Sequence, residues 1–431
     1  MTIDFKQRRQ RVLDALGNAV LLLPSAPLCI RNNDVEHEYR QDSDLFYLSG
    51  FDEPESVLCL RGGKDKPFTL FVRARDPERE VWDGRRAGVD GAVSDHGADE
   101  AFAIGELGQK LPELLENTTR LYYRLGRERD FDDTVLRAID KVRARAKLGV
   151  SWPVEIVDPT TLVHELRRVK AREELDLMRK AAEITREAHL GAMRAAKPGK
   201  HEYEVEAVML DVFRKHGAER LAYGPIVGSG PNATVLHYRK NDRLMQASDL
   251  LLIDAGCEYR YYASDVTRTF PVGGTFSGPQ RAVYEIVLGA QLASIAEVRA
   301  GATLETIHDA SVRVIAQGLI DLGLIAGPLE TALEQQTYKK YYMHRTCHYL
   351  GMDVHDVGRY FIDGKARPLD TGVVITVEPG IYVAENAEGA PEQYRGIGVR
   401  IEDDVLVTPE GGSVLTSDIP KSIDDVERAC A

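Results

Sequence analysis

Five potential metal ligands occur in the second half of this 431-residue chain, in the order Asp254, Asp265, His348, Glu378 and Glu402. The four acids stand at the end of, or inside, apolar strand-like or tightly turned segments, where an unpaired carboxylate is costly to bury. Several carboxylates share one site only if cations neutralise them. The fold must therefore bring these segments together. Four carboxylates and one imidazole suit a pair of divalent metals, which can activate a water and polarise a carbonyl, so the donor set favours amide-bond hydrolysis.

The first two acids lie close together in the sequence. Asp254 ends the apolar run LLLI, and Asp265 follows 11 residues later in YYASDVTRTF. A hairpin through Cys257 and Glu258 would bring both carboxylates to one end of the pair of strands. The alternative is that Asp254 only begins a turn and caps Gly256.

The last two acids are predicted to lie inside apolar strands. Glu378 stands in VVITVEPGIYV and Glu402 in GIGVRIEDDVLVT, so each needs a cation. Arg400 precedes Glu402 by two residues and would share its strand face. The alternative to a metal is therefore an ion pair between Arg400 and Glu402.

Three of the 11 histidines fall within the segment MHRTCHYLGMDVHDVG. His344 and His348 have the i, i+4 spacing of a zinc-protease helix, but Arg345 stands where such a helix needs its general-base glutamate. That reading fails. We expect one imidazole on the metal and two beside the substrate, as hydrogen-bond donors to a developing oxyanion.

Two segments of the second half resemble each other. KPGKHEYEVEAVMLDVFRKHG and RAGATLETIHDASVRVIAQGL place Gly199 and Gly301 102 residues apart. Each combines a long helix, a glycine turn, a second helix and later strands that carry acids. The helices are predicted over about 26 residues up to Pro198, and then over 202–215, 280–299 and 304–322. A duplicated α+β domain with ligands from both halves is expected.

The first 165 residues alternate short apolar strands with helices, the helices being predicted at 99–116 and 132–146. This alternation predicts an α/β domain with a mixed sheet. We place the domains at 1–168 and 169–431, in agreement with the chain length.

Charge argues against two classes of partner, and the cysteines indicate the compartment. The formal net charge is -13, and the 55 Lys and Arg residues are interspersed with 68 Asp and Glu residues, so neither nucleic acid nor a membrane is an expected partner. The N-terminal helix is too charged for a signal peptide, and no apolar run is long enough to span a bilayer. Five scattered cysteines without a CxxC motif favour reduced thiols and a cytoplasmic location.

The strings SDVTRTFP, HYLGMDVHDVG, TVEPGIYV and YRGIGVRIEDDVLVT resemble signature segments of the pita-bread metallopeptidases. YRQDSDLFYLSGFDEPES, EVWDGRRAG and VGSGPNATVLHY are similar to the proline-directed branch, specifically to bacterial Xaa-Pro aminopeptidases, the aminopeptidase P family. The similarity runs from about residue 5 to 420. It departs from the usual pattern at 345–347, where smaller or uncharged residues are common, and after Gly358.

The resemblance implies a role for each matching residue. Asp254 would chelate one metal, Asp265 and Glu402 would bridge both, and His348 with Glu378 would complete the other, with Glu378 also the general base. His237 and His355 would hold the substrate carbonyl, His344 and Arg400 would border the proline pocket, and Asp34 and Trp82 would approach the cleft of the same or a neighbouring subunit. The metal pair would be manganese, with zinc or cobalt as alternatives.

The expected function is the removal of the N-terminal residue from peptides with proline in second position, by a homodimer or homotetramer. An Xaa-Pro dipeptidase with the same ligands is the closest alternative. A creatinase-like hydrolase without metal and a non-catalytic pita-bread binding module are disfavoured, because all five ligand positions are intact.

Overall fold

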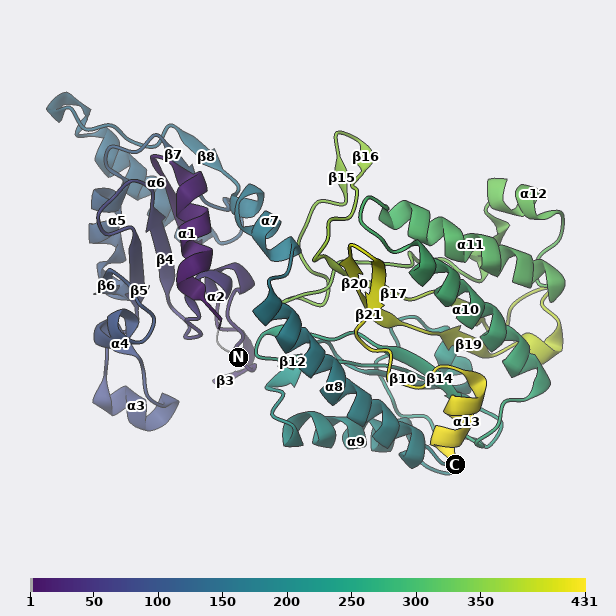
Figure 1. Cartoon of the computed structure of the whole chain (residues 1–431). Helices are drawn as coiled ribbons and strands as arrows, with labels where there is room; N and C mark the ends of the chain where they lie inside the picture. The colour runs from purple at the N-terminus through teal and green to yellow at the C-terminus, as the bar shows by residue number, and fades with distance from the viewer. Residues whose placement is uncertain (1–2) are drawn as a thin grey trace. The chain divides into compact units, whose positions relative to one another are not determined.

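A computed structural model describes residues 3–431 (Figure 1). The contacts of the chain divide it into two compact units, one extending to Arg167 and the other comprising Arg168–Ala431. Within the described residues, no helix combines the length and the apolar character needed to cross a bilayer.

The N-terminal unit is built on a six-stranded mixed sheet in the order β6-β5-β4-β1-β7-β8. Strand β1 pairs antiparallel with β4 and parallel with β7. Buried aliphatic side chains of β1, such as Val20 and Leu22, pack in one core with Leu111 of α5 and Val135 of α6. The strands are β1 Ala19–Pro24, β2 Ile30–Asn32, β3 Val35–Glu36, β4 Val57–Arg61, β5 Phe68–Val72, β6 Glu100–Ala103, β7 Arg120–Tyr122 and β8 Glu155–Val157. The helices are α1 Phe5–Leu16, α2 Ser43–Ser49, α3 Pro77–Asp83, α4 Gly88–Ser94, α5 Leu107–Leu115, α6 Arg129–Arg143 and α7 Val163–Arg168.

One predicted helix of this unit is wrong in its first turns. The segment expected to be helical over 99–116 begins as strand β6 and becomes helix α5 only at Leu107. Strand β6 pairs in parallel with β5 at the edge of the sheet, and the Asp99 carboxylate accepts a hydrogen bond from the Phe68 amide at 2.9 Å. The tertiary pairing therefore overrides the helical tendency of this stretch.

The second unit contains two similar halves. In the first, α8 (Arg172–Ala195) packs beside α9 (Glu202–Lys215), and a sheet in the order β10-β11-β14 follows. In the second, α10 (Gly278–Glu297) packs beside α11 (Leu304–Asp321), and a sheet in the order β17-β20-β21 follows (Figure 1). These strands are β10 Ile226–Ser229, β11 Leu250–Asp254, β14 Thr267–Pro271, β17 Val374–Val377, β20 Asp403–Thr408 and β21 Gly411–Val414.

The glycines that suggested the duplication occupy the same place in each half. Gly199 lies between α8 and α9 with φ +85°, and Gly301 lies between α10 and α11 with φ +84°. A residue with a side chain is strained in this left-handed region. In both halves, a glycine in the left-handed conformation therefore reverses the chain between the two helices.

The remaining elements complete the second unit. A hairpin of β18 and β19 pairs Gly380 with Arg400, and β12 pairs with both β9 and β13. Helix α13 packs against α8. The bounds are β9 Arg220–Leu221, β12 Cys257–Tyr259, β13 Tyr262–Ala263, α12 Leu329–Glu334, β15 Phe361–Ile362, β16 Lys365–Ala366, β18 Gly380–Val383, β19 Ile397–Arg400 and α13 Ile423–Cys430.

Candidate metal centre and active site

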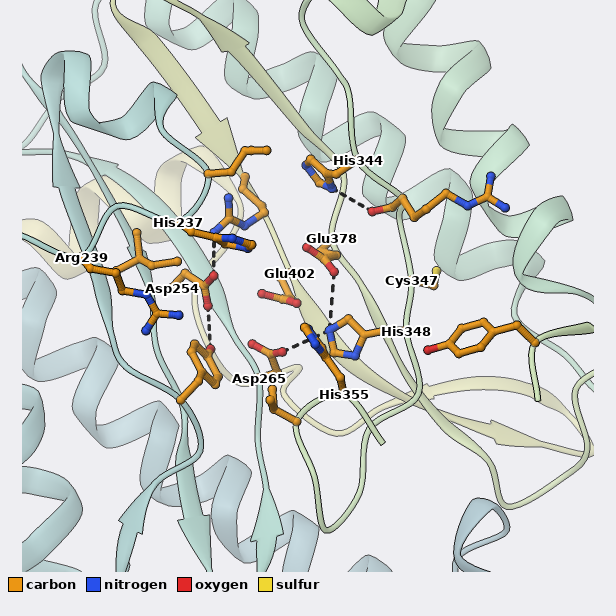
Figure 2. Close-up of a pocket in the computed structure, with 17 residues that line it drawn as sticks. His237, Arg239, Asp254, Asp265, His344, Cys347, His348, His355, Glu378 and Glu402 are labelled. Carbon is orange, nitrogen blue, oxygen red and sulfur yellow. Dashed lines mark hydrogen bonds and ion pairs between the residues drawn. The ribbon is translucent and has the colours of Figure 1, made fainter. Parts of the chain in front are cut away.

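Ligand atoms of Asp265, His348 and Glu402 lie within 4.8 Å of one another. The His348 Nε2 atom is 3.3 Å from the Asp265 carboxylate and 3.6 Å from that of Glu378. Figure 2 shows Asp265, Glu378 and Glu402 turned with His348 toward one centre. Four of the five predicted ligands therefore converge on one small space.

Matching strand ends carry the acids. Asp254 is the last residue of β11 and Asp265 lies shortly before β14, the strand paired with β11. In the second half, Glu378 directly follows β17 and Glu402 directly precedes its partner β20. The expectation that Glu378 and Glu402 lie inside strands is therefore wrong. The strands end where the side chains must turn into the site.

Asp254 is held by two side chains on the other side of the centre. Its carboxylate accepts hydrogen bonds from the Tyr223 hydroxyl and from the Arg400 guanidinium, both at 2.6 Å. Asp254 does not act as a mere turn cap for Gly256. Arg400 forms its ion pair with Asp254 and not with Glu402. The alternative in which Arg400 pairs with Glu402 in place of a metal is therefore wrong.

Neighbouring groups fix the direction of the His348 ring and the Glu402 carboxylate. His348 Nδ1 lies 3.0 Å from the carbonyl oxygen of Tyr349, which leaves Nε2 facing the acids. The Thr267 hydroxyl donates to Glu402 at 2.7 Å. A hydrogen bond to one ring nitrogen selects the tautomer in which the other nitrogen can bind a metal.

Burial, and after it the nearness of the other acids, raises the pKa values of three of the acids. Burial raises the pKa of Glu378 to about 8, although His348 and Arg400 oppose this shift. Burial, together with Asp265 and Glu378, raises the pKa of Glu402 well above its usual range, and burial raises that of Asp254 despite Arg400. Burial lowers the pKa of His348, but Asp265 and Glu378 outweigh it and raise this pKa to about 9. These shifts are those of buried acids that lie close together, and divalent cations would relieve them.

All five predicted ligands line a cavity of about 550 Å³. His237, His344 and His355 line the same cavity, as does Arg400. The His355 ring makes an edge-to-face contact with the ring of His348, with centroids 4.5 Å apart. The structure thus gathers every site residue predicted in this half of the chain.

Next to the acids, a short network joins His344 to Arg400 through the hydroxyl of Tyr382. That hydroxyl lies 2.8 Å from His344 Nε2 and accepts from Arg400 at 2.9 Å. Burial and the charge of Arg400 lower the pKa of His344 to about 3. The His344 imidazole is therefore neutral at physiological pH.

Some residues of the site were not predicted. Tyr223, Tyr382 and Thr267 bond directly to Asp254, Arg400 and Glu402 respectively. Thr267 and Tyr382 stand inside the strings SDVTRTFP and TVEPGIYV, so their proximity to the ligands could have been noticed. Tyr223 lies 31 residues before Asp254 and no spacing connects it with the acids.

Asp34 and Trp82 belong to the N-terminal unit. The indole of Trp82, on α3, is highly exposed. Their approach to a cleft stays a prediction.

Comparison with known proteins identifies the family. The profile of metallopeptidase family M24 matches residues 176–409, and that of the aminopeptidase P N-terminal domain matches residues 5–122. The chain belongs to metallopeptidase family M24. The Xaa-Pro aminopeptidase of Haemophilus influenzae is 44% identical over 98% of this chain and 96% of its own, and that of Escherichia coli is 42% identical with the same coverage.

Solved structures agree with the sequence relatives. Aminopeptidase PepP of Pseudomonas aeruginosa is similar with a TM-score of 0.97 and 48% identity, covering 99% of this chain and 97% of its own. Zinc-substituted aminopeptidase P of Escherichia coli, in complex with product, has a TM-score of 0.96 at 40% identity and covers 100% of this chain and 99% of its own. The predicted α/β domain followed by a duplicated pita-bread domain is therefore confirmed.

Proposed function

We propose that the chain is a dinuclear Xaa-Pro aminopeptidase, a metallo-exopeptidase that releases the N-terminal residue from peptides with proline in second position. The observation that carries this is a cavity lined by five metal donors, four of which converge, and by three further histidines. The relatives that cover nearly the whole chain bear the name of this activity.

The division of the donors between two metals follows the resemblance to the family. Asp254 would hold one ion, Asp265 and Glu402 would hold both, and His348 with Glu378 would complete the other. Bound divalent cations activate a water and polarise the scissile carbonyl. The oxygen-rich donors suit manganese, and zinc or cobalt would also be accepted.

The side chains of the chain itself would handle the protons and the substrate. Glu378, whose pKa lies near 8 in the metal-free site, is placed to accept the proton of the attacking water. His237 and His355 would donate to the oxygen of the substrate carbonyl as negative charge develops on it. His344 and Arg400 would border the pocket for the proline ring.

Three arginines line the cavity, Arg239, Arg345 and Arg400, and the contacts of Arg400 bear on the choice between an aminopeptidase and an Xaa-Pro dipeptidase. A dipeptidase needs a positive group for the free carboxylate that directly follows proline. The Arg400 guanidinium is committed to Asp254, Tyr382 and the Thr267 hydroxyl, and the residue is only 3% exposed. Arg400 is thus not available to close the cleft at that position.

We further propose a cytoplasmic homodimer or homotetramer. All five cysteines carry free thiols, which suits a reducing compartment. The acidic net charge of -13 gives no support to nucleic acid or an anionic membrane as a partner.

Substrate length separates the two peptidase activities. The protein is expected to cleave Ala-Pro-Ala at least as well as Ala-Pro, because an aminopeptidase leaves the far end of the cleft open. The measurement is kcat/KM on both peptides with the same metal loading. A fall of more than about tenfold, or ~1.4 kcal/mol, from Ala-Pro to Ala-Pro-Ala would assign the dipeptidase activity instead.

A further inference from the structure

A buried ion pair involves the residue that directly follows His355 in the sequence. The Lys170 ammonium contacts the Asp356 carboxylate at 2.8 Å, and each side chain is 1% exposed. The ammonium also donates to the carbonyl oxygen of Arg168 at 3.3 Å. Lys170 is the third residue of the second unit, and Asp356 directly follows His355. A charged pair this deep is costly to build and costly to break on one side.

The Lys170 end of the pair is anchored by backbone hydrogen bonds. The Lys170 amide donates to the carbonyl of Gly372 at 2.9 Å, and the Gly372 amide donates to that of Val407 at 2.9 Å. Val407 belongs to β20, the strand that follows Glu402. The backbone of Lys170 is thereby tied to the second-half sheet.

The Asp356 end belongs to the loop that runs from His348 through His355 to Asp356. The Asp356 amide donates to the carbonyl of Tyr349 at 2.8 Å, which folds the loop back on itself. A Cβ atom at Gly351 would lie 2.1 Å from the Asp356 carboxylate and 2.8 Å from the side chain of Lys170. The loop is therefore closed tightly around the pair.

His355 stands at the exposed edge of this loop. Its side chain is exposed in the cavity, whereas that of the next residue, Asp356, is buried. The path of the backbone at Asp356 therefore decides where the His355 ring lies. The ring must reach the carbonyl oxygen of the substrate within hydrogen-bond distance, which leaves little tolerance.

We propose that the Lys170–Asp356 pair positions His355 for catalysis. This inference rests on the proposed function, in which His355 is a donor to the substrate carbonyl. Lys170 and Asp356 are positioning residues, since they act through the loop. Loss of the pair should leave the acids of the metal centre in place while the loop shifts or becomes mobile.

A double-mutant cycle on kcat/KM for Ala-Pro-Ala tests the proposal. His355→Ala is expected to lower the rate by about 10²–10³-fold through loss of an oxyanion donor. Lys170→Met is expected to lower kcat by about 10–10²-fold with little change in KM, as for a displaced catalytic group. In the His355→Ala background, Lys170→Met should cost less than about threefold, because the group that it positions is gone.

Controls separate positioning from general damage. Lys180→Met removes a half-buried lysine of α8 that pairs with Glu183, and should leave kcat/KM unchanged. Metal content should equal that of the unchanged protein in every variant. Asp356→Asn keeps the shape of the side chain and replaces Lys170→Met in the cycle if that variant fails to fold.

Hydrogen exchange supplies a readout that does not depend on activity. In the Lys170→Met protein, amides over 349–356 should exchange faster than in the unchanged protein, while those of α10 should not. Equal rate losses from Lys170→Met with and without His355, or unaltered exchange over 349–356, would overturn the proposal. If the unchanged protein cleaves no Xaa-Pro peptide, the proposed function fails, and the exchange experiment still decides whether the pair holds the loop.

Discussion

Removal of the divalent cations is expected to abolish peptidase activity and to lower the melting temperature. Asp254, Asp265, Glu378 and Glu402 are crowded into one centre, and without cations they repel one another. Metal at about 100 times its Kd should stabilise the fold enough to raise Tm by roughly 5–10 °C. The test is treatment with a strong chelator, with metal loss confirmed by elemental analysis, followed by readdition of manganese. Full activity in verified metal-free protein would refute the metal assignment.

The metal-free protein should also show a distinctive dependence of stability on pH. In the folded metal-free state, the pKa of Glu378 is raised to about 8 and that of His348 to about 9. Both groups therefore hold protons in the folded state that the unfolded chain releases above its ordinary pKa values. The free energy of unfolding should accordingly fall as pH rises above the ordinary pKa values of 4.5 and 6.5, until both groups are deprotonated above about pH 9. Protein saturated with metal should lack most of this slope, because its ligands are already deprotonated.

Glu378→Gln is expected to lower kcat by at least about 10²–10⁴-fold, the typical loss when a general base is removed. The amide keeps the shape of the side chain, but it accepts no proton and is a weaker metal ligand. The matched control is Glu388→Gln, at an exposed position a short distance along the chain, which should retain full activity. Metal analysis of both variants separates lost base function from lost metal.

A small effect of Glu378→Gln would assign the general base to another residue. If the variant retained more than about a tenth of the rate of the wild-type protein, the loss would be far smaller than removal of a general base produces. Another group in the cavity would then have to accept the proton.

The two halves of the catalytic unit could be predicted because their signals are local. Apolar residues at helical spacing and a following glycine locate α8 and α9, and the predicted second helix, 202–215, matches α9. Gly199 and Gly301 mark equivalent turns because both require the left-handed backbone conformation. The family, and with it the fold class, followed from the ligands together with their flanking strings, and both are confirmed.

Other features depend on distant residues and were missed. The first turns of the helix predicted at 99–116 form β6 because β5 offers a free sheet edge there. The partner of Arg400 is Asp254, 146 residues away, since β19 lies against β11 in the folded unit. Proximity along the sequence pointed to Glu402 instead, and no single-sequence pattern reveals which acid a buried arginine will face.

The products released from Ala-Pro-Ala by the manganese-loaded protein test the central claim most directly. The proposed activity predicts equal amounts of free alanine and Pro-Ala at early times, no comparable cleavage of Ala-Ala-Ala, and loss of both products after chelation. Release of Ala-Pro with alanine, equal cleavage of Ala-Ala-Ala, or no cleavage by fully metal-loaded protein would contradict the assignment as an Xaa-Pro aminopeptidase.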